Sequence, residues 1–179
     1  MQRPKSQYWN GNIPWLKTGE INYSEITTAE ECITEQGLRN SAAKLAPPGT
    51  ILMAMYGQGV TRGRVAILGI EAAFNQACLA IMPFERLQTK YLYYYLRSAY
   101  SFVRDFGNET SQMNLSSGLI SKIKILVPSD TEQKEVSDFL DRKLIDFDLS
   151  ISKQEQIIES LHLLKQTFVA NAVTGKIKV

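Results

Sequence analysis

The chain has 179 residues, of which 44% are hydrophobic and 21% charged, and its formal net charge at pH 7 is +2. This composition excludes an intrinsically disordered chain, and no apolar run approaches the roughly 20 residues of a membrane-spanning helix. The polar first residues lack the apolar centre of a signal peptide, so we expect a cytoplasmic protein without membrane association, in which Cys32 and Cys78 stay free thiols.

The first 128 residues contain short apolar runs separated by Gly, Pro, Asn and Ser, which is typical of β-strands joined by turns. A Pro-Pro-Gly turn at residues 47–49 directly precedes one of these runs. The runs predict strands at Ile13–Leu16, Thr50–Tyr56, Arg64–Ile70, Phe74–Met82 and Ile120–Val127.

Residues 89–106 predict a single helix within this β-rich region, because one helical face is apolar and consists of Leu92, Tyr95, Leu96, Ala99, Phe102 and Val103. The tyrosines of this segment could form a platform on which nucleic-acid bases stack. At this spacing, however, most of them are better interpreted as part of an amphipathic core.

Residues 129–172 contain neither Gly nor Pro and predict one long helix. Ser129 and Glu132 have the spacing of a capping box at its start, and Gly175 is a suitable stop. A helix of about 40 residues would be about 60 Å long, too long for the preceding domain to cover. Its apolar seam therefore predicts a partner helix, and the seam consists of Leu140, Leu144, Phe147, Ile151, Ile158, Leu161 and Phe168.

These patterns together predict an α+β chain of two parts. Residues 1–128 form a β-rich domain with small helices, and residues 129–179 form one long coiled-coil helix with a short tail. The boundary lies in the sequence LVPSD at residues 126–130.

A catalytic site is not evident from the sequence. The one histidine, His162, lies inside the predicted long helix, whereas a catalytic triad needs its histidine in a cleft. No zinc or calcium spacing occurs, and no nucleotide-binding motif opens a helix. Asp130, Glu132 and Lys134 faintly resemble a nuclease cluster, but the helix cap explains the same residues. We therefore expect no metal and no cofactor in this chain.

A glycine-rich turn at residues 57–63 is the feature that core packing explains least. Residues 37–70 around it contain four basic residues and no acidic one, and the turn precedes a strand rather than a phosphate-binding helix N-terminus. Glycines let a backbone approach another surface closely, and Arg and Gln make paired contacts with guanine and adenine. The candidate DNA contacts are Tyr56, Gln58, Thr61, Arg62 and Arg64, and the weaker candidates, for phosphate contacts, are Lys17, Thr18, Arg39 and Asn40. A hairpin whose arginines merely face solvent is the alternative.

Five segments, in order along the chain, resemble the specificity subunit of Type I restriction–modification enzymes. They are YWNGNIPWLKTGEIN (8–22), PPGTILMAMYG (47–57), FNQACLAI (74–81), QMNLSSGLISKIKILVPSDTEQKEVSDFLD (112–141) and VTGKIKV (173–179). The fourth segment and the closing VTGKI are the most specific of the five.

The resemblance implies a DNA-recognition subunit without a catalytic centre. Such a subunit is built from target recognition domains, each of which reads one half of a split double-stranded DNA target. Its long helices pair antiparallel, set the separation of the half-sites and help to dock modification (methyltransferase) subunits. S-adenosylmethionine and ATP are then expected only in the partner subunits, among which a restriction subunit can occur.

The chain differs from full-length members of that family, which usually have two recognition domains and two helices. This chain has one of each and a shorter start, which fits a natural half-subunit or a fragment of a longer subunit. A single helix leaves the seam unpaired, and a homodimer through residues 130–172 would bury it. Asn114 and Ser116 are expected to be structural.

Two other functions remain as alternatives at this point. The first is a protein-interaction module whose coiled-coil arm brings partners together without any contact to DNA. The second, a free-standing methyltransferase or nuclease, is disfavoured because the catalytic and cofactor motifs are missing.

Overall fold

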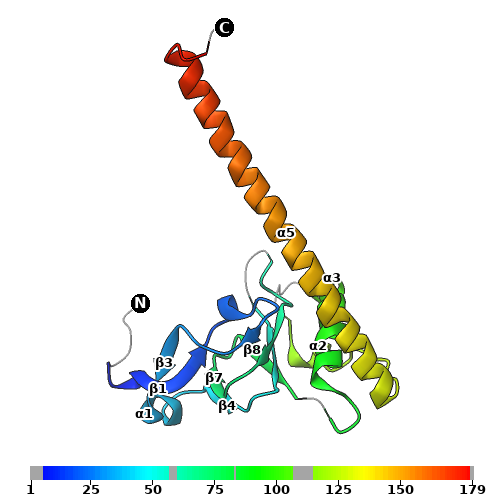
Figure 1. Ribbon diagram of the computed structural model, residues 1–179. Coiled ribbons are helices and arrows are strands. Elements are labelled where there is room, and N and C mark those ends of the chain that lie inside the picture. The colour runs from blue at the N-terminus through cyan, green and yellow to red at the C-terminus, as the bar shows by residue number, and fades with distance from the viewer. Residues whose placement is uncertain (1–5, 57–59, 83, 107–114, 178–179) are drawn as a thin grey trace. The chain divides into compact units, whose positions relative to one another are not determined.

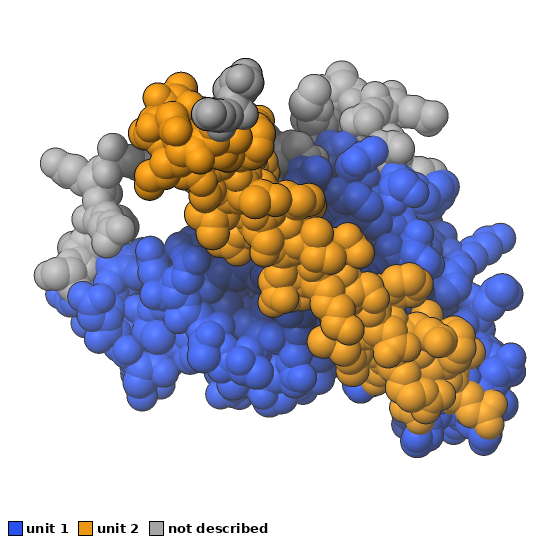
Figure 2. Space-filling model, turned by 45° about the horizontal axis from the view of Figure 1, so that its top comes forward, with its two compact units in different colours: residues 1–134 blue, residues 135–179 orange. Residues whose placement is uncertain are grey.

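The computed structural model describes residues 6–56, 60–82, 84–106 and 115–177 (Figure 1). The chain divides into two compact units, which Figure 2 distinguishes by colour: residues 1–134, called the head here, and residues 135–179, called the arm. The first turn of the long helix belongs to the head, where Gln133 hydrogen-bonds to the backbone of Gln88 and Arg86.

Two four-stranded sheets build the head. The first has the strand order β3 (Glu31–Ile33), β1 (Trp9–Leu16), β7 (Ala72–Phe74) and β4 (Lys44–Ala46). The second has the order β2 (Glu25–Ile26), β6 (Val65–Leu68), β5 (Ile51–Ala54) and β8 (Cys78–Ile81). The helices of the head are η1 (Ser6–Tyr8), η2 (Thr18–Glu20), α1 (Glu35–Arg39), α2 (Thr89–Ser98), α3 (Tyr100–Phe106) and α4 (Ser117–Ile120).

Strand β5 is buried on both faces, which explains its uninterrupted apolar sequence. Leu52 and Ala54 belong to an apolar cluster shared with residues of the first sheet, such as Leu16. Ile51 and Met53 point the other way and pack in a second cluster with the apolar residues of α2 and α3. The head is therefore layered: first sheet, second sheet, and then helices α2 and α3.

The predicted strands Thr50–Tyr56 and Arg64–Ile70 contain β5 and β6, and Ile13–Leu16 is the second half of β1, but the later predictions need correction. Phe74–Met82 is two strands in different sheets, because the Asn75 side chain accepts the Ala77 N–H (3.0 Å) and closes a turn. The predicted strand Ile120–Val127 is wrong. Ile120 ends α4, and the following backbone bonds to tyrosine side chains of α2, Tyr91 to the Leu126 carbonyl and Tyr95 to the Lys124 carbonyl (both 3.0 Å).

The predicted helix 89–106 is likewise two helices, α2 and α3. The break is at Ala99, whose backbone (φ −80°, ψ 5°) caps α2. Leu92, Leu96 and Val103 of the predicted face are buried, and Tyr93, which was not assigned to that face, is buried with them. Tyr95 and Ala99 are only half-buried, and Phe102 is 54% exposed, contrary to the prediction. Ser116, expected to be structural, caps α4 by accepting the Leu119 N–H (3.2 Å), whereas Asn114 lies outside the described residues.

The long helix α5 (Asp130–Val173, 44 residues) confirms the prediction from periodicity. At 1.5 Å per residue it is about 66 Å long. The Ser129 side chain accepts the Glu132 N–H (3.3 Å), one of the two predicted capping bonds, and Gly175 (φ +73°) follows the helix end. Among the described residues, no helix combines the length and apolarity that crossing a membrane requires.

The predicted seam of α5 is largely bare. Leu140 and Leu144 are half-buried, but the five seam residues that follow are exposed: Phe147 by 62%, Ile151 by 55%, Ile158 by 54%, Leu161 by 58% and Phe168 by 60%. Apolar side chains at regular helical spacing and exposed to this degree are typical of a surface that another helix covers.

Candidate nucleic-acid interface

The turn between β5 and β6, which carries most of the predicted DNA contacts, folds back tightly on its own strands. The Gly63 N–H donates to the Ala54 carbonyl (2.8 Å), and the Arg64 N–H to the Thr61 carbonyl (3.1 Å). Gly63 has φ +84°, and a Cβ there would lie 3.4 Å from a Val103 methyl carbon. This glycine therefore lets the turn approach helix α3 closely, rather than an external surface.

Arg62 differs from the expectation of a side chain that faces DNA. It is only 8% exposed, and its Nη2 donates to the Arg104 carbonyl oxygen at 2.6 Å. Arg104 lies in the last turn of α3, where helix carbonyls have no partner within the helix and carry partial negative charge. Arg62 thus ties the turn to the C-terminal end of α3.

The other predicted contact residues of the turn differ in their exposure to solvent. Tyr56 is 39% exposed, Thr61 is half-buried, and Gln58 lies outside the described residues. The Tyr100 hydroxyl donates to the Val60 carbonyl (2.6 Å), which fixes the turn to α3 a second time.

Arg64 belongs to a group of arginines and tyrosines that we call the Tyr23 cluster: Tyr23, Arg64, Arg97, Tyr100 and Arg104. The guanidinium carbons of Arg64 and Arg97 lie 5.7 and 5.1 Å from the centre of the Tyr23 ring. That of Arg104 lies 5.6 Å from the centre of the Tyr100 ring, and the two rings meet edge to face at 5.9 Å. These distances are within the range of cation–π attraction.

Tyr23 is held in an unusual backbone conformation, with φ +68°. Its N–H donates to the Val65 carbonyl (3.0 Å), and its own carbonyl accepts from the Tyr93 hydroxyl. Burial, followed by the neighbouring Tyr100, raises the pKa of Tyr23, while the Arg64 and Arg97 charges act in the opposite direction. The ring is therefore a neutral phenol at physiological pH.

Sequence reasoning missed every member of this cluster except Arg64. The cluster joins residues from three distant segments, so no local motif announces it. The one available signal was the spacing of Arg97 and Arg104, seven residues apart in a segment predicted to be helical, which places them on the same side.

The weaker candidates lie elsewhere in the head. The Lys17 ammonium pairs with Glu30 (3.1 Å) and Glu31 (3.5 Å), and the hydrogen bond to Glu30 is the main reason that the pKa of Lys17 is raised. Thr18 opens the short helix η2. Lys17 is therefore neutralised by carboxylates, which weakens the case for a phosphate contact.

Arg39 and Asn40 stand at the end of α1, which packs on the first sheet, whereas the β5–β6 turn belongs to the second. Arg39 is exposed, and the Asn40 side-chain amide donates to the Gln36 carbonyl (2.8 Å). Asn40 also lines a pocket of about 300 Å³ whose aromatic residues are Tyr8, Trp9 and Trp15. The structure thus places the two groups of candidates on different sheets.

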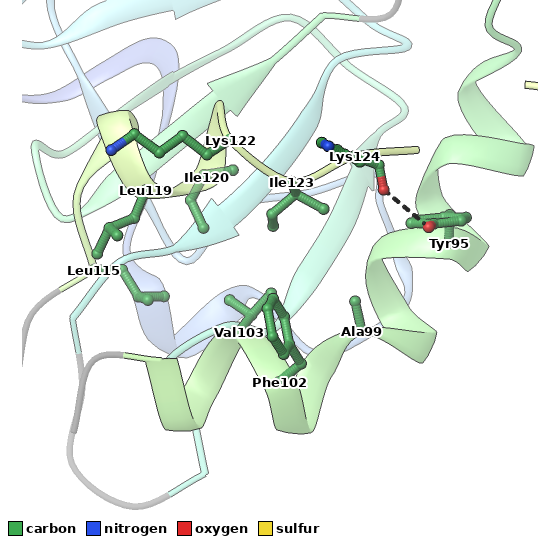
Figure 3. A pocket seen from close by; sticks show the side chains of 10 residues that line it. All are labelled: Tyr95, Ala99, Phe102, Val103, Leu115, Leu119, Ile120, Lys122, Ile123 and Lys124. Carbon is green, nitrogen blue, oxygen red and sulfur yellow. Dashed lines mark hydrogen bonds between the residues drawn. The ribbon is translucent and has the colours of Figure 1, made fainter. Parts of the chain in front are cut away.

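Figure 3 shows another feature of the head, a pocket of about 400 Å³ between α2–α3 and residues 115–124. Its lining is mostly apolar and includes Phe102, whose ring is 54% exposed. Among the described residues of the lining, Lys122 and Lys124 are the charged ones. The same described residues include no carboxylate, thiol or imidazole, and their titratable groups are the phenol of Tyr95 and the amines of Lys122 and Lys124.

Reactive groups are scarce in the part of the chain that the structure describes. No cluster of His, Cys, Asp and Glu there could hold a metal ion. Cys32 and Cys78 are free thiols, as predicted, and burial raises the pKa of Cys78 to about 12, which keeps it protonated and inert. His162 is exposed on α5.

Comparison with known proteins gives a consistent result. The family model described as "Type I restriction modification DNA specificity domain" matches residues 2–162. The EcoR124I/EcoR124II specificity subunit of Escherichia coli is 28% identical over 142 residues, which cover 77% of this chain and 35% of the relative. The MjaIX specificity subunit of Methanocaldococcus jannaschii is 27% identical over 170 residues, 91% of this chain and 38% of the relative. The chain therefore spans less than half the length of these relatives.

Solved structures show the same fold at lower sequence identity. A chain from a structural study of complex assembly and conformational transition in the type I R-M system superposes with a TM-score of 0.76 at 17% identity, covering 96% of this chain and 41% of that one. The HsdS subunit from Thermoanaerobacter tengcongensis gives a TM-score of 0.58 at 18% identity, covering 79% of this chain and 32% of that one.

Proposed function

The chain belongs to the family of Type I restriction modification DNA specificity domains, and from this we propose that it recognises a DNA sequence on behalf of a modification enzyme and does not itself alter DNA. The observation that carries the proposal is the family match over residues 2–162, which takes in the head and most of α5. The head reads one half of a bipartite double-stranded target, and the protein acts in the cytoplasm, where that DNA lies.

The surface we assign to DNA is the β5–β6 turn together with the Tyr23 cluster. Tyr56 and Thr61 are at least partly accessible, and Gln58 is retained as a candidate from its chemistry alone. Arg64 is retained as well, whereas buried Arg62 becomes a residue that positions the turn. Lys17, Thr18, Arg39 and Asn40 are no longer the preferred phosphate contacts.

The arm pairs with the arm of a second copy. Two seams of this length would bury the exposed apolar side chains, and the two-fold axis between the copies would present two heads to two-fold-related half-sites. The length of α5 then sets the separation of the half-sites.

A second apolar face supports docking of modification subunits on the arm. Ile145, Leu149 and Leu163 are exposed by 59%, 57% and 65%. At 3.6 residues per turn they lie on the side of α5 opposite the seam. Pairing of two arms would leave this face free for the methyltransferase partners, in which S-adenosylmethionine and ATP chemistry would take place.

Binding of duplex DNA by the assembled complex tests the proposal. This chain, mixed with its modification subunit, is expected to retain a duplex containing the target more tightly than a scrambled one. The logarithm of the affinity is expected to fall linearly with the logarithm of the salt concentration, because phosphate contacts release counterions. A complex that binds neither duplex at low salt would favour the alternative, a protein-interaction module, for which the apolar faces of the arm are the supporting observation.

A further inference from the structure

We infer that Arg64 and Arg97, held on the ring of Tyr23, form a clamp for the phosphate backbone of the bound nucleic acid. The inference rests on the proposed function and names the part of the DNA that this site contacts. Arg97 and Tyr23, unlike Arg64, are assigned to this surface on structural grounds alone.

The first argument is that no carboxylate among the described residues of the head neutralises the charges of Arg64 and Arg97. Among the described residues, Arg64 and Arg97 form no ion pair with a carboxylate, in contrast to Lys17, which has two. Both guanidiniums lie against one ring, that of Tyr23. Like charges gathered in this way repel one another, and an anion bound between them would remove the repulsion.

The second argument is pre-organisation. A free arginine loses side-chain entropy when it is fixed on a ligand, whereas stacking on an aromatic ring meets part of that cost before binding. Tyr23 is itself fixed by hydrogen bonds at its N–H and its carbonyl, and its backbone stays in a conformation that few non-glycine residues adopt. Such a conformation persists only where the surroundings enforce it, and it is frequent at binding sites.

The third argument concerns what these arginines can reach. Both side chains are half-buried, and the Nε of Arg64 is buried without a hydrogen-bond partner among the described residues. A guanidinium held against the protein surface presents its terminal amino groups but cannot extend into a groove to read a base edge. Phosphate oxygens, which lie on the outside of the duplex and accept paired hydrogen bonds from arginine, fit this position.

The neutral state of the Tyr23 ring is consistent with this role. A phenolate would pair with the two guanidiniums and repel phosphate, but a tyrosine with its ordinary pKa is already protonated at physiological pH, and burial raises the pKa of Tyr23 further. The ring therefore positions the two cations without neutralising them.

The test uses the full chain assembled with its modification subunit and compares Arg97→Gln with Arg86→Gln. Arg86 is an exposed arginine just before α2, so its substitution removes the same charge outside the cluster. R97Q is expected to weaken binding to target and scrambled duplexes by the same factor, about fivefold to tenfold, and to reduce the salt slope by about 1. R86Q is expected to leave the affinity within about twofold and the slope unchanged.

Arg97→Lys supplies a second readout if R97Q lowers the melting temperature. Lysine keeps the charge but lacks the paired donors, so R97K should retain the salt slope and bind both duplexes more weakly. A wild-type slope and affinity in R97Q, or a loss confined to the target duplex, would overturn the clamp while leaving DNA recognition intact. Absence of salt-dependent binding by the wild-type complex would instead overturn the proposed function.

Discussion

Aspartate at both Ile151 and Ile158 is expected to convert a dimer of this chain into a monomer at micromolar concentration. Both residues lie on the seam of α5 and are more than half exposed in the single chain. Burying such a side chain contributes about 1.5–3 kcal/mol, and the dimer contains two copies of each. The double substitution should therefore weaken association on the order of ten-thousand-fold or more, since it also places carboxylates opposite each other.

Sedimentation equilibrium or light scattering measures this effect. The matched control is Ser152→Asp with Gln156→Asp, which adds the same charge at exposed positions off the seam. The control should remain dimeric. A wild-type chain that is monomeric at these concentrations, or a control that dissociates as readily as the seam variant, would show that the seam does not pair two copies.

Loss of the Gln133 side chain is expected to produce the largest destabilisation of the head by a single substitution. Gln133 is fully buried in the first turns of α5. Its Oε1 accepts the Gln88 N–H (2.9 Å), and its Nε2 donates to the carbonyls of Arg86 (2.9 Å) and Pro128 (3.0 Å). One side-chain amide thus pairs with backbone groups at the start of α2, in the loop before α2 and in the loop before α5.

Gln133→Ala would remove the partner of that N–H and of both carbonyls, in hydrogen bonds that are part-buried, and would open a cavity. Each unsatisfied group costs about 1–3 kcal/mol, so we expect the free energy of unfolding to fall by about 3–5 kcal/mol. Urea denaturation monitored by tryptophan fluorescence measures it. Thr131→Ala, an exposed change in the same turn, should shift stability by less than about 0.5 kcal/mol. A loss below about 1 kcal/mol for Q133A would mean that water replaces the amide.

The parts of the structure that the sequence predicted well are those with strong periodicity. Helix α5 was recognisable because its apolar residues recur over many turns without Gly or Pro. Strands β5 and β6 were recognisable as continuous apolar runs, since both faces of the central strand are buried. Strands β2, β3 and β4 have only two or three residues each, too few for any alternation to be visible.

The errors occurred where a tertiary contact or a single turn residue overrides the composition of the segment. Residues 120–127 have the β-branched composition of a strand, yet their carbonyls bond to tyrosine hydroxyls of α2 instead of to a neighbouring strand. The side chain of Asn75 divides an apolar run between two sheets. The partners of residues 120–127 lie far away along the chain, whereas the turn at Asn75 is local, formed with the N–H of Ala77.

The candidate site shows the same division. The basic, glycine-rich turn was found from composition, but which of its arginines faces outward depends on α3. Arg62 is drawn inward by a helix-end carbonyl, while Arg64 meets a tyrosine ring supplied from residue 23. The sequence pattern indicates that arginines of this turn suit a DNA contact. Only the packing of the head shows which of those arginines is accessible.

A map of adenine methylation in DNA tests the central claim most directly, namely that this chain supplies recognition and spacing while a partner performs the chemistry. DNA would be incubated with S-adenosylmethionine and the modification subunit, with this chain, or with both. We expect methylation at one bipartite, two-fold-related sequence only when both are present, and a target whose half-sites move apart when whole turns are added to the arm. Methylation or cleavage by this chain alone, or the same pattern without it, would contradict the account.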